Sequence, residues 1–73
     1  MANSTIDLIR LNIKKYRNQK GLSQEKLSEI AGISRDYLSE IERGKRTPSL
    51  KRLLMIAEVL EIEAYKLLMY FWY

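Results

Sequence analysis

Residues 22–44 decide the fold of this chain, and they read LSQEKLSEIAGISRDYLSEIERG. A glycine at position 32 divides the stretch into two short segments, each with apolar residues at the three- and four-residue spacing of a helix. The positions that would hold one helix across the other are Leu27, Ile30, Ala31, Ile33, Leu38 and Ile41. The pattern predicts two crossed helices, with the polar residues that begin the second one facing outward.

The rest of the chain continues the helical pattern, and no segment shows the alternation of a strand. A first helix is expected over residues 5–20, with Ile6, Ile9, Ile13 and Tyr16 on one buried stripe. Ser23 and Ser34 are the expected N-caps of the two central helices, the second of which should end at Gly44. These signals predict an all-α fold.

Two more helices are expected after Gly44. Thr47 or Ser49 would cap the fourth, whose core stripe is expected to be Leu50, Leu53, Leu54, Ala57 and Leu60. A fifth would run from about Ile62 to Tyr70, although Glu61 and Glu63 stand where glycine and serine are preferred between two helices. The expected architecture is five helices in one domain spanning residues 1–73, with a central unit at about 23–44 and a C-terminal helix and tail at 62–73.

Composition limits the chemistry that the chain can perform. It has 73 residues, no cysteine and no histidine, so disulfides are excluded and only carboxylates remain as metal ligands. No glycine-rich phosphate loop or recognisable catalytic motif is present. We expect no metal, no cofactor and no enzymatic activity. Because the start lacks a signal peptide and no apolar run approaches the ~20 residues of a membrane span, we expect a cytoplasmic protein.

The net charge of +4 is distributed unevenly. Residues 1–20 carry five basic side chains and one acidic one, and residues 43–52 carry five basic side chains and no acidic one. The segment between them, residues 21–42, is net acidic. Two basic segments therefore flank the central pair of helices, which favours contact with nucleic-acid phosphates, although charge runs on small helical proteins are often only solvated faces.

The start of the second central helix offers side chains that could recognise bases. The candidate base-reading residues are Arg35, Asp36, Ser39 and Glu40. Arginine can donate two hydrogen bonds to guanine, whereas the acidic residues can accept from cytosine or instead orient Arg35 through a salt bridge. The candidate phosphate-binding residues are Gln24, Ser34, Tyr37, Arg43, Lys45 and Arg46. The N-terminal end of such a helix is the part that meets base edges in the major groove of DNA.

These motifs resemble those of the phage-repressor type helix-turn-helix family, also called the XRE or lambda-repressor-like family. The resemblance rests on Leu22-Ser23-Gln24-Glu25, Ala31-Gly32-Ile33-Ser34, Tyr37 to Gly44 and Thr47-Pro48-Ser49-Leu50. It implies a compact five-helix DNA-binding domain that usually acts as a dimer. It also implies a structural ion pair between Arg17 and Glu42. Ser28 departs from the alanine that the family prefers, and we expect its hydroxyl to bond to a carbonyl one turn earlier.

The C-terminal segment carries more aromatic and apolar residues than one small core can use. The residues expected at a dimer interface are Tyr65, Leu68, Met69, Phe71 and Trp72. The alternative is that the tail folds back over the first helix of its own chain. A membrane-surface anchor is disfavoured because the segment lacks a cationic flank.

The interpretation that joins these features is a sequence-specific DNA-binding transcriptional regulator, acting as a homodimeric repressor or autoregulator on an operator. The alternative is an antitoxin-like or regulatory protein that acts chiefly through a protein partner bound by the C-terminal aromatic residues, because one fold can serve both roles.

Overall fold

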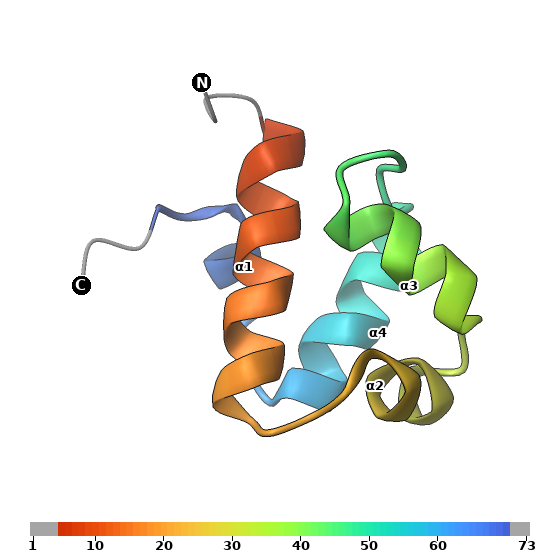
Figure 1. Ribbon diagram of the computed structural model, residues 1–73. Coiled ribbons are helices and arrows are strands. Elements are labelled where there is room, and N and C mark those ends of the chain that lie inside the picture. The colour runs from red at the N-terminus through yellow and green to blue at the C-terminus, as the bar shows by residue number, and fades with distance from the viewer. Residues whose placement is uncertain (1–4, 71–73) are drawn as a thin grey trace.

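The computed structural model describes residues 5–70, which form four α-helices and one short 3₁₀ helix (Figure 1). The elements are α1 (Thr5–Gln19), α2 (Gln24–Ala31), α3 (Arg35–Glu42), α4 (Leu50–Leu60) and η1 (Ala64–Leu68). Within the described residues there is no strand, which confirms the expected all-α fold. None of the helices over this range is long and apolar enough to cross a membrane.

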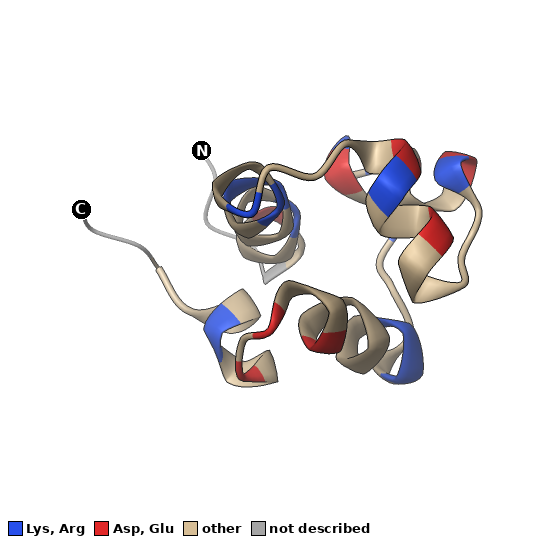
Figure 2. Cartoon of the chain, turned by 90° about the horizontal axis from the view of Figure 1, so that it is seen from below, with Lys and Arg blue, Asp and Glu red and all other residues tan. Residues whose placement is uncertain are grey.

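Helix α1 crosses in front of the C-terminal segment, and α2, α3 and α4 lie on its other side (Figure 1). It packs against α3, α4 and η1, while α4 also contacts α2 (Figure 2). A single core lies where these elements meet, and its fully buried members are Ile13, Leu27, Leu38, Ile41, Ile56 and Leu67. Because every described element contributes to this core, the position of α3 is fixed from several sides.

Serine N-caps define where the central helices begin. The Oγ atoms of Ser23 and Ser34 accept hydrogen bonds from the backbone N–H groups of Lys26 and Tyr37, which confirms both expected caps. Of the two candidates for α4, the cap is Ser49, which accepts from the N–H of Arg52 at 3.2 Å. These caps satisfy amides that have no partner within the helix.

Three expected sets of buried apolar residues were wrong in part. Ile6 is 41% exposed and Ile30 is 54% exposed, because both lie beyond the edge of the core. On α4 the buried residues are Leu53, Ile56, Ala57 and Leu60, whereas Leu50 and Leu54 face solvent. Apolar residues cover two sides of α4, so the helical period alone does not select the side that packs inward.

The expected fifth α-helix was also wrong, since the chain forms only the five-residue helix η1 there. Glu61 ends α4 in the left-handed conformation at φ 59°, which glycine would adopt without steric cost. Glu63 then precedes η1 with an extended backbone and no side-chain cap hydrogen bond. Without a cap, a short segment has little to stabilise an α-helix beyond its first turn.

Buried Asn12 of α1 holds the end of η1 and the residue that follows it. Its Nδ2 donates to the backbone oxygens of Leu67, at 3.0 Å, and Met69, at 2.6 Å. Leu67 is itself fully buried, so this part of the C-terminal segment packs on its own domain. Tyr65, at 58%, and Leu68, at 46%, remain exposed. Two of the expected dimer residues, Phe71 and Trp72, lie outside the described residues.

Candidate nucleic-acid interface

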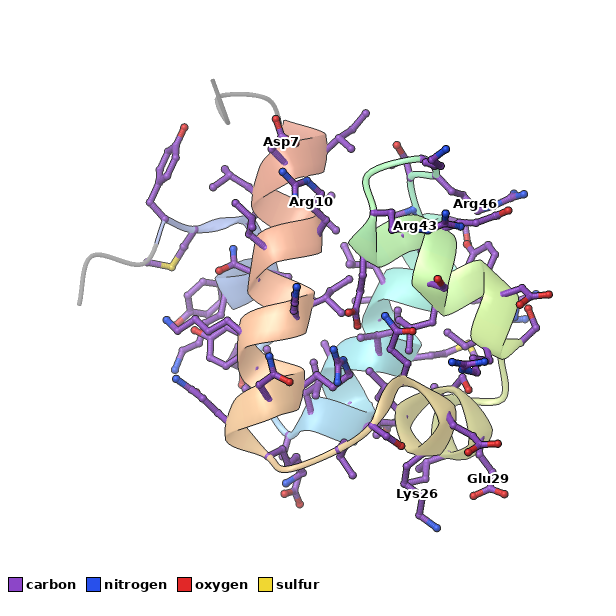
Figure 3. The ribbon with its side chains drawn as sticks, viewed as in Figure 1. Asp7, Arg10, Lys26, Glu29, Arg43 and Arg46 are labelled. Carbon is purple, nitrogen blue, oxygen red and sulfur yellow. The ribbon has the colours of Figure 1, made fainter. Side chains whose placement is uncertain are left out.

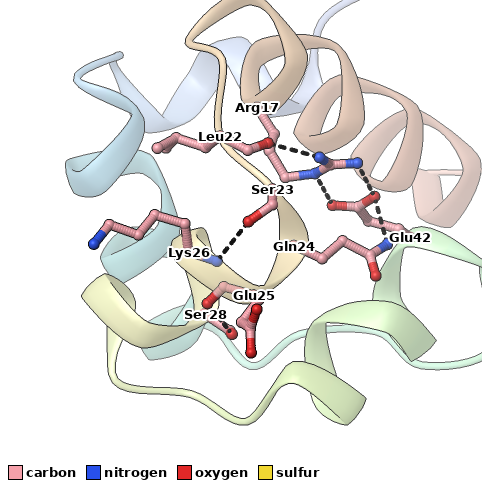
Figure 4. A network of polar contacts seen from close by, with 8 residues as sticks. All are labelled: Arg17, Leu22, Ser23, Gln24, Glu25, Lys26, Ser28 and Glu42. Carbon is pink, nitrogen blue, oxygen red and sulfur yellow. Dashed lines mark hydrogen bonds and ion pairs between the residues drawn. The ribbon is translucent and has the colours of Figure 1, made fainter.

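The turn between α2 and α3 sets the angle at which α3 is presented. Gly32 takes the left-handed conformation at φ 73°, and its N–H donates to the backbone oxygen of Glu29. Ser28 is buried at the contact between the two helices, and its Oγ donates to the backbone oxygen of Glu25 at 2.9 Å (Figure 4). The expected bond to the preceding turn is therefore confirmed, and it removes the cost of burying the hydroxyl.

One face of α3 is buried and the opposite face is open. Leu38 and Ile41 are at most 1% exposed and hold the helix on the core. Arg35 and Asp36, at the start of the helix, are exposed, and Ser39 one turn later is half-buried. The N-terminal end of α3 therefore presents a guanidinium, a carboxylate and a hydroxyl away from the apolar interior.

A buried polar network joins Arg17 of α1 and Gln24, the first residue of α2, to Glu42, the last residue of α3 (Figure 4). Arg17 Nε and Nη2 donate to the two carboxylate oxygens of Glu42 at 2.7 and 2.9 Å, and Arg17 Nη1 donates to the backbone oxygen of Leu22 at 2.8 Å. Gln24 Nε2 donates to Glu42 Oε1 at 3.0 Å. The ion pair implied by the resemblance is thus present and bidentate, and it also orients Gln24.

Beside this network lies a polar hollow of about 470 Å³, lined by Arg17, Ser23, Gln24, Glu25 and Arg35. It opens between the N-terminal ends of α2 and α3, where backbone N–H groups carry partial positive charge. The amide of Gln24 and the guanidinium of Arg35 border the same hollow. Such a hollow has the size and the donors to receive an anionic oxygen.

The loop after α3 folds back onto the helix through a second ion pair. Arg46 Nε donates to Glu40 Oε1 at 2.7 Å, so Glu40 pairs with Arg46 rather than with Arg35. The hydrogen bond and the charge of Arg46 hold the pKa of the Glu40 carboxyl below its ordinary value. The same pair raises the pKa of Arg46. Two residues expected to contact DNA separately are therefore joined to each other.

Two guanidinium groups lie near the ring of Tyr37. The Arg46 group is 5.3 Å from the ring centroid and the Arg52 group is 5.5 Å from it, both within the range of a cation–π interaction. The Tyr37 hydroxyl accepts from the backbone N–H of Ser49 at 3.4 Å. Arg52 was not predicted as a site residue from the sequence. Its position in the basic segment 43–52 could have indicated it.

The remaining basic residues of the loop are exposed. Arg43 and Arg46 lie at the same end of α3 (Figure 3), and Arg43 Nε makes a hydrogen bond of 3.4 Å to the backbone oxygen of Ser39. Lys45 is exposed, and its backbone N–H donates to the oxygen of Glu40. Across residues 5–70, no group of three acidic side chains could hold a metal ion.

Comparison with known proteins places this geometry among helix-turn-helix proteins. The family described as HTH_3, helix-turn-helix, matches residues 13–67. The chain is similar to control protein C.SmaI of Serratia marcescens, with 39% identity over 62 residues that cover 85% of this chain and 74% of that protein. It is also similar to the HTH-type transcriptional regulator SinR of Bacillus subtilis (strain 168), with 42% identity over 62 residues. That match covers 84% of this chain and 56% of SinR, little more than half of its length.

A solved structure with a similar fold is that of SinR, the master regulator for biofilm formation, in complex with DNA. Its TM-score is 0.79 at 41% identity, and the match covers 82% of this chain and 97% of that chain. These similarities favour a DNA-binding regulator and do not favour the alternative of a protein that acts chiefly through a protein partner.

Proposed function

This chain belongs to the helix-turn-helix family, and we propose that it is a sequence-specific transcriptional regulator whose helix α3 reads the major groove of DNA. The observation that carries the proposal is the exposed position of Arg35 at the first residue of α3, while Leu38 and Ile41, further along the helix, hold it on the core. A helix held in this way can enter a groove without disturbing the core.

The proposed base contacts come from the first turns of α3. Arg35 would donate two hydrogen bonds to O6 and N7 of a guanine, and Asp36 would accept from the amino group of a cytosine. Ser39 can donate or accept. Glu40 shares its carboxylate with Arg46, so it would accept from a base only where that ion pair opens.

The proposed phosphate contacts surround α3. Glu42 holds the Gln24 amide in place, so a phosphate oxygen entering the hollow would meet a donor that is already oriented. At the other end of α3 the candidates are Arg43, Lys45, Arg46 and Tyr37, with Ser34 at the N-cap. These contacts would supply affinity and register, whereas the α3 contacts would supply sequence preference.

The full proposal is a cytoplasmic, non-catalytic repressor or autoregulator that binds its operator as a homodimer. Two copies would place their α3 helices in successive major grooves, about 34 Å apart. A dimer doubles the base contacts and requires a site with two half-sites.

The experiment is selection of a binding site from random duplexes, followed by fluorescence anisotropy with the selected duplex and a scrambled one. Arg35→Ala should cost about 1–3 kcal/mol on the selected site and relax its preference at one base pair. Lys45→Ala should weaken binding to both duplexes equally and reduce the salt slope by about 1. Lys66→Ala is the matched control, because Lys66 is an exposed cation on η1 away from α3.

Two results would contradict the proposal. One is equal affinity for the selected and scrambled duplexes at about 0.1 M salt. The other is an Arg35→Ala variant that keeps the full preference of the wild type.

A further inference from the structure

The outer face of α4 is apolar and has no partner among residues 5–70. Leu50 is 71% exposed and Leu54 is 49% exposed, although both are leucines on a helix whose other side is fully packed. Together with Lys51, Met55 and Glu58 they line a shallow groove of about 480 Å³. Exposed leucines that lie together on one groove are a feature of interaction surfaces.

The charges on this groove oppose the dipole of their own helix. Lys51 lies in the first turn of α4 and Glu58 near its last turn. A helix dipole favours acidic residues at the start and basic residues at the end. Neither side chain forms an ion pair with another residue of the described range 5–70. These two charges therefore do not stabilise the isolated chain.

We propose that this face binds a second copy of the chain, with α4 antiparallel to the α4 of that copy. Lys51 and Glu58 are seven residues apart, which is about 10.5 Å along the helix. A two-fold axis between Leu54 and Met55 brings Lys51 of each protomer opposite Glu58 of the other. The same operation places Leu54 of each protomer beside Leu54 and Met55 of the other at the axis, so one groove is complementary to itself in polarity and charge.

The antiparallel arrangement also removes the unfavourable placement of the two charges. Each Lys51 then lies beside the C-terminal end of the neighbouring α4, and each Glu58 lies beside its N-terminal end, where the dipole favours them. A specific interface buries at least about 1,000 Å² in total, which is more than one groove supplies. Tyr65 and Leu68 are exposed on η1, which packs beside α4, and they would extend the apolar contact.

This inference deepens the proposed function, because it rests on the dimer proposed there and assigns its surface. The test is sedimentation equilibrium of the full chain without DNA, for the wild type, Lys51→Glu, Glu58→Lys and the double variant. Each single reversal places like charges opposite each other twice across the two-fold axis, so the dimer Kd should rise at least about tenfold. The double variant restores opposite charges and should return to within about threefold of the wild type.

Folding does not confound the test. Each reversal gives its end of α4 a charge of the sign that the helix dipole favours there. The melting temperatures of the variants, measured as dilute monomers, should therefore be no lower than that of the wild type. A further variant, Leu54→Glu, places two carboxylates at the axis and should give a monomer by itself.

Three outcomes would overturn the interface. The first is a wild type that stays monomeric up to about 1 mM. The second is a dimer whose Kd none of the α4 substitutions changes, which would move the interface to the C-terminal segment. The third is a double variant as weak as the single ones, which excludes the antiparallel pairing. A failure of DNA binding would instead appear in the anisotropy measurements, which are independent of the dimer Kd.

Discussion

Removal of the Glu42 carboxylate tests whether the buried network positions α3. Glu42→Ala deletes both hydrogen bonds to Arg17, at 2.7 and 2.9 Å, and the one from Gln24 at 3.0 Å. Arg17 is only 8% exposed, so its guanidinium would remain buried with the backbone oxygen of Leu22 as its one remaining partner in the network. The change therefore leaves a charge in a poorly solvating site rather than simply removing a contact.

The expected loss is large compared with the stability of the fold. Removing one partner of a buried ion pair costs about 3–5 kcal/mol. A chain of 73 residues has a total unfolding free energy of roughly 4–11 kcal/mol. At a urea m-value of about 1 kcal/mol/M, a loss of 3 kcal/mol lowers the unfolding midpoint by about 3 M.

The assay is urea unfolding followed by circular dichroism at 25 °C. Glu29→Ala is the matched control, because Glu29 pairs with Lys26 at 3.3 Å on the surface and its loss should cost under about 0.5 kcal/mol. The double variant Arg17→Met, Glu42→Leu removes both charges. Its free energy of unfolding should lie within about 1 kcal/mol of the wild-type value or exceed it. A Glu42→Ala variant that loses less than about 1 kcal/mol would refute the reasoning, since its Arg17 would then be adequately solvated.

Three further predictions concern the loop after α3, the end of α4 and the C-terminal segment. Arg46 lowers the pKa of Glu40 in the folded chain, so this pair contributes stability above the ordinary pKa and loses it as pH falls through the lowered value. Arg46→Ala should raise the Glu40 midpoint in a carbon-13 NMR titration, and an unchanged midpoint would exclude the pair in solution. Glu61 has φ 59°, so Glu61→Gly should be about 1 kcal/mol more stable than Glu61→Ala in thermal unfolding, and equal stability would argue against the left-handed conformation. Asn12→Asp turns a donor into an acceptor facing the same carbonyl oxygens, so it should lose about 1–3 kcal/mol at neutral pH, more than Asn12→Ala, and speed amide exchange in η1. Unchanged exchange in both variants would show that Asn12 does not hold η1.

The local features of the site could be predicted from the residues alone. A capping serine, a glycine with positive φ and a periodic apolar stripe each act within about four residues, and this is why Ser23, Ser34 and Gly32 were placed correctly. The exposure of Arg35 follows from its place at the first residue after the Ser34 cap, where the helix runs past the core, although it stands three residues before the buried Leu38. The Arg17–Glu42 pair spans 25 positions, and only the family resemblance indicated it.

Tertiary packing decided the rest. Apolar residues occupy two sides of α4, and only contacts with α1, α2 and η1 determine that Leu53 is buried while Leu54 is exposed. The segment around Leu67 and Met69 is held on α1 because Asn12, more than 50 positions earlier, donates to the backbone oxygens of both residues. Sequence spacing records which residues share a helix face, but the face that becomes core depends on which other elements are close enough to exclude water from it.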